Sequence, residues 1–174
     1  MVNLSIYVGT YQKYNEGSLY GKWIDLSNYS NLDEFFKDIK ELHNDEDDPE
    51  FMFQDYEASD LIKSLNLISE SHLSSDIFEI LDTIDSSNYD VEVIEAYLDC
   101  MGYNDEEITE VIERVEESYN GEFNNDVDFT QNLLEDCGDI PENLPSYIHI
   151  DWESTARDIM FDYSTSNNHY FRNY

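Results

Sequence analysis

The sequence predicts an α+β protein made of three small subdomains, at residues 1–60, 61–120 and 121–174. Hydrophobic residues make up 40% of the chain and aromatic residues 14%, which is enough apolar surface to bury a core. An unfolded acidic chain lacks such residues. Apolar residues alternate as in strands near both ends of the chain, and they recur at helical spacing through the middle. Mixed secondary structure in short elements follows from these two observations.

Residues 1–60 are expected to form a small antiparallel sheet with one helix. Alternating apolar residues predict three strands, at Leu4–Val8, Leu19–Leu26 and Phe51–Tyr56, with Gly21 as a bulge in the second. Tyr14–Ser18 has the composition of a turn. The helix is predicted from one apolar face that runs from Leu32 to Leu42, with Asn31 and Glu34 as a capping pair.

Residues 61–120 are expected to contain helices only. Apolar spacing predicts four of them, containing Leu61 to Ile68, Ile77 to Ile84, Val91 to Met101 and Ile108 to Tyr119. Asp90 is expected to cap the third helix and Gly102 to end it. Asn104 is expected to begin the fourth helix, and Gly121 to end it.

The last third of the chain is expected to mix both kinds of element. A short helix around Phe129 is predicted to end at Gly138. Strands are predicted at Tyr147–Ile150 and His169–Phe171, on either side of a helix at Trp152–Tyr163.

Charge is the most informative feature for function. The chain has 41 acidic residues against 8 Lys and Arg, a net charge of -33. Between Ser64 and Thr155 the only cation is Arg114. Binding to nucleic acid needs Lys and Arg to neutralise phosphates, and anionic membranes repel such a chain. The partners that remain are proteins with basic grooves, or metal cations.

Enzymatic and cofactor chemistry have no support in the sequence. No Gly-rich phosphate loop or GxSxG motif occurs, and the four histidines are scattered. The acidic run Asp45–Glu50 lacks the glycine and the terminal glutamate of an EF-hand loop. We therefore expect no catalytic residue, cofactor or metal site. No signal peptide or membrane-spanning stretch is visible and there is no CxxC pair, so a cytoplasmic protein with reduced thiols is expected.

The acidic helices carry the strongest functional pattern. Glu106, Glu110, Glu113 and Glu117 recur at spacings of four, three and four, which places them on one ridge of a helix. Carboxylates on successive turns are ~5–6 Å apart, comparable to phosphates along a DNA strand. The predicted phosphate-mimicking surface comprises Asp45, Glu46, Asp47, Asp48, Glu50, Asp105, Glu106, Glu107, Glu110, Glu113, Glu116, Glu117, Glu122, Asp126, Asp128, Glu135, Asp136, Asp139 and Glu142.

The size of the charge also predicts a shape. Duplex DNA carries one charge per ~1.7 Å, so the net charge of -33 matches ~56 Å, or ~16–17 base pairs. A 20.5 kDa chain can display such a footprint only if it is elongated.

A family resemblance is carried by the segments Ile6–Tyr11, Lys13–Trp23, Phe51–Glu57, Leu133–Gly138 and Ile140–Glu142, followed by Tyr147–Ile148 and Ala156–Asp158. Together these segments resemble the ArdA antirestriction family. The resemblance covers nearly the whole chain, and in the middle third it rests on helical, acidic character. It implies an elongated three-part fold, dimerisation through the C-terminal part, and mimicry of bent B-form DNA. Such a protein occupies the DNA groove of type I restriction–modification enzymes, at the methyltransferase core with its specificity subunit, and spares incoming plasmid or transposon DNA.

Two other classes remain open on the sequence. A general acidic interaction module would sequester many basic DNA-binding proteins without preferring restriction enzymes. A salt-adapted or metal-buffering protein would depend on molar salt or calcium for its stability.

Overall fold

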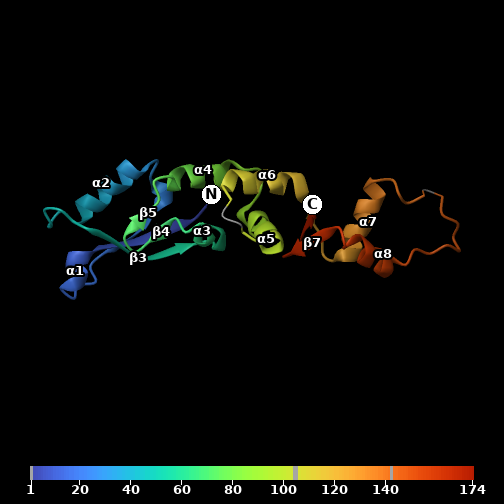
Figure 1. Cartoon of the computed structure of the whole chain (residues 1–174), viewed down its shortest axis with the longest axis horizontal. Coiled ribbons are helices and arrows are strands. Elements are labelled where there is room, and N and C mark those ends of the chain that lie inside the picture. The colour runs from blue at the N-terminus through green and yellow to red at the C-terminus, as the bar shows by residue number, and fades with distance from the viewer. Residues whose placement is uncertain (1, 104–105, 142) are drawn as a thin grey trace. The chain divides into compact units, whose positions relative to one another are not determined.

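The computed structural model describes residues 2–103, 106–141 and 143–174. It is an α+β protein, as predicted, made of short helices and small antiparallel sheets (Figure 1). The chain folds into two compact units, Met1–Val91 and Glu92–Tyr174. The finer division at 1–60, 61–120 and 121–174 stays a prediction.

A three-stranded antiparallel sheet organises the first unit. Its strands, in spatial order, are β2 (Lys22–Asp25), β1 (Leu4–Thr10) and β3 (Phe51–Ala58). On β1, Ile6 and Val8 are fully buried, whereas Tyr7 on the other face is half-buried. The first and third predicted strands are therefore confirmed, and alternation along β1 separates a core face from a wetter face.

Helix α2 (Leu32–Leu42) supplies the other half of this core. Phe35 and Ile39 are fully buried, and the Phe35 ring lies 6.4 Å from that of Phe53 on β3. The Asn31 side chain accepts a hydrogen bond from the Glu34 backbone N–H at 3.0 Å, so the predicted cap is confirmed.

Two predictions in the first unit are wrong in extent. The strand predicted at Leu19–Leu26 begins only at Lys22, and after it the Asp25 carboxylate caps the 3₁₀ turn η1 (Leu26–Asn28) by accepting from the Ser27 N–H. The turn predicted at Tyr14–Ser18 starts inside helix α1 (Tyr11–Asn15), which Thr10 caps. The residues of α1 are exposed or half-buried, so no apolar face signals this helix.

The expectation of helices alone at residues 61–120 is also wrong. Helix α3 (Asp60–Ser64) ends early because Asn66 adopts a left-handed conformation, with φ 52°. The chain then forms a small hairpin, β4 (Ile68–Ser69) with β5 (His72–Leu73), so Ile68 lies in a strand. Helix α4 (Ile77–Ser86) follows as predicted.

The second unit opens with α5 (Val91–Met101) and α6 (Ile108–Ser118). Gly102 ends α5 with φ 80°, as predicted. The predicted start of the next helix at Asn104 lies outside the described residues. The predicted stop at Gly121 is wrong, because α6 ends at Ser118 and Gly121 belongs to strand β6 (Tyr119–Glu122), at a register shift with φ 117°.

The remaining elements of this unit are α7 (Asp126–Asp136), α8 (Trp152–Ile159), β7 (Tyr163–Ser166) and β8 (His169–Arg172). The end of α7 before Gly138 and the strand at His169 are confirmed. The strand predicted at Tyr147–Ile150 is wrong: that stretch has no regular structure, and the Tyr147 side chain is 80% exposed. The helix predicted to reach Tyr163 is too long, since Tyr163 begins β7 in a sheet of order β6-β8-β7.

Aromatic rings form the core of the second unit. The Phe129 ring of α7 stacks on Tyr170 of β8 with centroids 4.5 Å apart, and Tyr163 meets Phe129 edge-on at 4.9 Å. The Tyr170 hydroxyl donates to an Asp126 carboxylate oxygen at 2.8 Å. The sheet thereby fixes the first turn of α7, which carries two of the predicted acidic residues.

This contact predicts a pH dependence of stability. Burial, together with the hydrogen bond to Asp126, raises the pKa of Tyr170 to about 12. A raised phenol pKa stabilises the fold below the unfolded value of about 10, and that contribution is lost as the pH rises through about 12. Tyr170→Phe should remove this alkaline loss, together with the last phenolate step in an absorbance titration. A phenolate step near pH 12 that persists in the folded variant would contradict the assignment.

Candidate functional site

Helix α6 has one buried and one acidic face. Its buried side chains are Ile108, Val111, Val115 and Ser118. At 100° per residue, Glu110, Glu113 and Glu117 point away from that stripe, and all three are exposed. The apolar stripe therefore fixes which way the carboxylates face.

Glu106 differs from the other members of the predicted ridge. It precedes α6, is half-buried, and forms an ion pair with Arg114 at 3.0 Å. Tyr97 also interacts with Arg114. Arg114, the one cation of the acidic stretch, is therefore engaged inside its own unit. Within the described part of the chain, no Lys or Arg forms an ion pair with the α6 residues Glu110, Glu113, Glu116 or Glu117.

The acidic residues of α7 fall into two groups. Asp126 and Asp128 lie in its first turn, where the macrodipole favours carboxylates, and both accept side-chain hydrogen bonds. Glu135, Asp136 and Asp139 are exposed at or beyond the opposite end of α7, where no basic residue occupies the last turn. A carboxylate at a helix C-terminus costs about 0.3–1 kcal/mol. The first group thus supports the helix, and the second weakens it.

Carboxylates at the C-terminal end of α6 also interact unfavourably with the helix macrodipole. Its last turn contains Glu116 and Glu117 and no basic residue. Local stability accounts for neither these residues nor those at the end of α7.

The acidic run Asp45–Glu50 lies in the first unit, between α2 and β3. The Lys13 ammonium reaches Asp45 at 2.7 Å and Glu46 at 3.0 Å. The Glu46 side chain is only 6% exposed and also accepts from the Thr10 hydroxyl. Two residues of the run therefore tie the loop to α1, whereas Asp47, Asp48 and Glu50 are exposed.

Lys13 contributes to the pKa shifts of Glu46, Asp45 and His43 in this cluster. Burial opposes ionisation of Glu46, yet hydrogen bonds from Thr10 and Lys13 hold its pKa below the usual value. The hydrogen bond from Lys13 likewise lowers the pKa of Asp45. Burial and the Lys13 charge lower the pKa of His43, which is fully buried and lies 3.1 Å from the Lys13 ammonium.

His43, Asp45 and Glu46 have ligand atoms within 4.8 Å of one another, close enough for a metal ion. The Lys13 ammonium contacts all three side chains. The Lys13 ammonium therefore already supplies positive charge to this cluster, and we assign no metal to it. No sequence pattern marks Lys13 as part of this cluster, because its contacts form only in the folded chain.

The remaining predicted site residues lie beside α6, at the end of β6, or outside the described residues. Glu107 directly precedes α6, and Glu122 ends β6; both are exposed. Asp105 and Glu142 lie outside the described residues. The second unit thus carries the acidic residues of α6, β6 and α7, and the first unit carries the run Asp45–Glu50.

The acidic surface of α6 and α7 carries exposed carboxylates at helix ends, where they lower the stability of these helices. The sequence profile of the antirestriction protein ArdA matches residues 6–172, almost the whole chain. The chain belongs to the ArdA family. No curated protein matches the chain. No helix in residues 2–103, 106–141 or 143–174 is long and apolar enough to cross a membrane.

Proposed function

We propose that this ArdA chain mimics B-form DNA and competitively inhibits type I restriction–modification enzymes. Its carboxylates would occupy the DNA-binding groove of the methyltransferase core and specificity subunit, where the enzyme holds phosphates. One observation carries this proposal. Exposed carboxylates lie at the C-terminal ends of α6 and α7, where they destabilise the helices. Among the described residues, no Lys or Arg forms an ion pair with them.

Membership of the ArdA family supports the antirestriction role, and the net charge of -33 supports the mimicry. Electrostatic steering should make association fast and sensitive to salt. The proposal includes an elongated homodimer that acts in the cytoplasm without catalysis or a cofactor. Protection of incoming mobile DNA follows from blocking the restriction enzyme.

A titration tests the proposal. The purified protein is added to a type I restriction enzyme that cleaves unmodified DNA, with polyglutamate at equal charge as the control. We expect inhibition near one dimer per enzyme, relieved by excess DNA. Inhibition no stronger than that by polyglutamate would leave only bulk charge, and would favour a general acidic module that sequesters basic proteins.

A further inference from the structure

Strand β2 (Lys22–Asp25) lies at an edge of the first sheet. It pairs with β1 on one side, and no described strand pairs with its other side. Edge strands carry unpaired backbone N–H and C=O groups, which can pair with an added strand. All of β2 except Ile24 is exposed, and the Asp25 carbonyl accepts a hydrogen bond from the Asn28 side chain at 3.2 Å.

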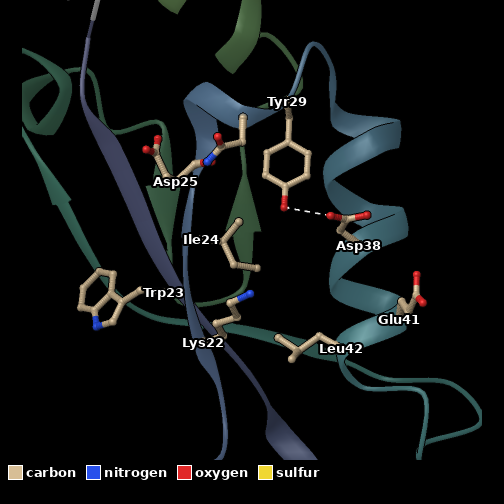
Figure 2. A pocket seen from close by; sticks show the side chains of 9 residues that line it. Lys22, Trp23, Ile24, Asp25, Tyr29, Asp38, Glu41 and Leu42 are labelled. Atoms are coloured by element: carbon tan, nitrogen blue, oxygen red, sulfur yellow. Dashed lines mark hydrogen bonds between the residues drawn. The ribbon is translucent and has the colours of Figure 1, made fainter.

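A groove of about 460 Å³ lies between β2 and α2. Ile24 and Leu42 supply its apolar part, and Asp38 and Glu41 line it from α2 (Figure 2). The Tyr29 hydroxyl donates to Asp38 at 3.1 Å and holds that carboxylate in place. Burial and this hydrogen bond raise the pKa of Tyr29.

The charge of the groove limits what can occupy it. Asp38 and Glu41 lie on the α2 side of the groove, and one cation, Lys22, lies on its β2 side (Figure 2). Trp23, which also borders the groove, is 41% exposed, and its side chain lies on the other side of the β2 ribbon from Lys22 (Figure 2). Tyr7 supports the Trp23 ring edge-on at 5.5 Å. An exposed indole face attracts Arg and Lys.

We propose that the β2 edge binds an extended basic segment of a partner protein as an added strand. Side chains of an added strand alternate between the two faces of the sheet. An Arg or Lys on one face would enter the groove beside Asp38 and Glu41, and the next basic residue on the other face would lie over Trp23. A second copy of the chain is a poor occupant, because it brings the same excess of negative charge to the edge.

This edge shares no residue with the surface proposed to mimic DNA. None of Asp25, Asp38 and Glu41 belongs to that surface, and the recognition differs in kind. DNA mimicry places carboxylates where phosphates bind, whereas the β2 edge offers backbone hydrogen bonds and side-chain pockets to a peptide.

Peptide binding to the full chain tests the inference. The probe, called the Thr–Arg peptide, is a ten-residue peptide of the sequence Thr-Thr-Arg-Arg-Thr-Thr-Arg-Arg-Thr-Thr, in which neighbouring arginines point to opposite faces of the sheet. It is titrated by calorimetry at ~0.15 M salt. The control for strand pairing, called the Pro–Arg peptide, has proline at every Thr position and the same charge. In either register at least half of the positions that face β2 are then proline, which cannot donate a backbone hydrogen bond. We expect the Pro–Arg peptide to bind about tenfold more weakly. Hydrogen exchange of the β2 amides should slow only with the Thr–Arg peptide.

Matched variants separate the groove from bulk charge. Asp38→Asn with Glu41→Gln removes two exposed carboxylates of α2, and Glu110→Gln with Glu113→Gln removes two exposed carboxylates of α6. We expect the α2 variant to raise the Kd about tenfold and the α6 variant to change it less than twofold. Equal weakening by both variants, equal binding of both peptides, or no binding of the Thr–Arg peptide would overturn the inference. Restriction inhibition is not the readout, so this result is independent of the proposed function.

Discussion

Replacing Glu110 and Glu113 with lysine should weaken inhibition of a type I restriction enzyme by about 10- to 100-fold. Both side chains are exposed on α6, opposite its buried stripe. Each reversal removes an attraction to a basic groove and adds a repulsion. The fold should persist, because neither carboxylate forms an ion pair with a described residue. The inhibition constant is measured at two salt concentrations, with circular dichroism to confirm folding.

Helix α4 supplies a matched control for this experiment. Glu79 and Asp82 occupy its third and sixth positions, as Glu110 and Glu113 do in α6, and both are exposed. Glu79→Lys with Asp82→Lys therefore makes the same change in net charge at equivalent helix positions. Equal losses of inhibition would indicate bulk charge, and full potency of the folded α6 variant would refute a role for this ridge.

Lys13→Met should lower the free energy of unfolding by about 3 kcal/mol. The substitution keeps an unbranched side chain of similar size but removes the ammonium from Glu46, whose side chain is 6% exposed. A buried carboxylate that loses its cation retains its desolvation cost. Urea denaturation measures the change.

Lys63→Met is the control, because the Lys63–Asp60 pair is solvent-exposed and such pairs contribute about 0.2–1 kcal/mol. Acid titration provides a second readout. The lowered pKa values of Asp45 and Glu46 stabilise the native chain above their ordinary values of 3.8 and 4.5, and that contribution is lost as the pH falls through the folded values. In Lys13→Met this part of the acid loss should shrink. Equal effects of the two lysine substitutions would show that the Lys13 cluster does not stabilise the fold.

Residue spacing in the sequence predicted the structure correctly where a local pattern determined it. Ile6 and Val8 alternate with polar neighbours and became the core face of β1, and the Asn31 cap lies where its spacing to Glu34 predicted. The family was also recognisable, because its motifs are spread over nearly the whole chain.

Predictions failed where long-range packing decided the structure. Tyr147–Ile150 alternates like a strand, but no described strand pairs with it, and its residues 147–149 remain exposed. Tyr163 continues a helical pattern, yet it joins a hairpin whose turn depends on the left-handed residues Asn167 and Asn168. In the candidate site, spacing alone placed Glu106 on the ridge and could not reveal its pairing with Arg114.

The end of α7 has a practical consequence for spectroscopy. Cys137 caps that helix, is exposed, and directly follows Glu135 and Asp136. The other thiol, Cys100, is half-buried, and burial together with the charge of Asp99 raises its pKa. A maleimide at neutral pH therefore has one favoured target. A spin label or fluorophore can be attached beside the acidic end of α7 without mutating the chain, where it would report both the approach of a partner and the distance between two copies in a dimer.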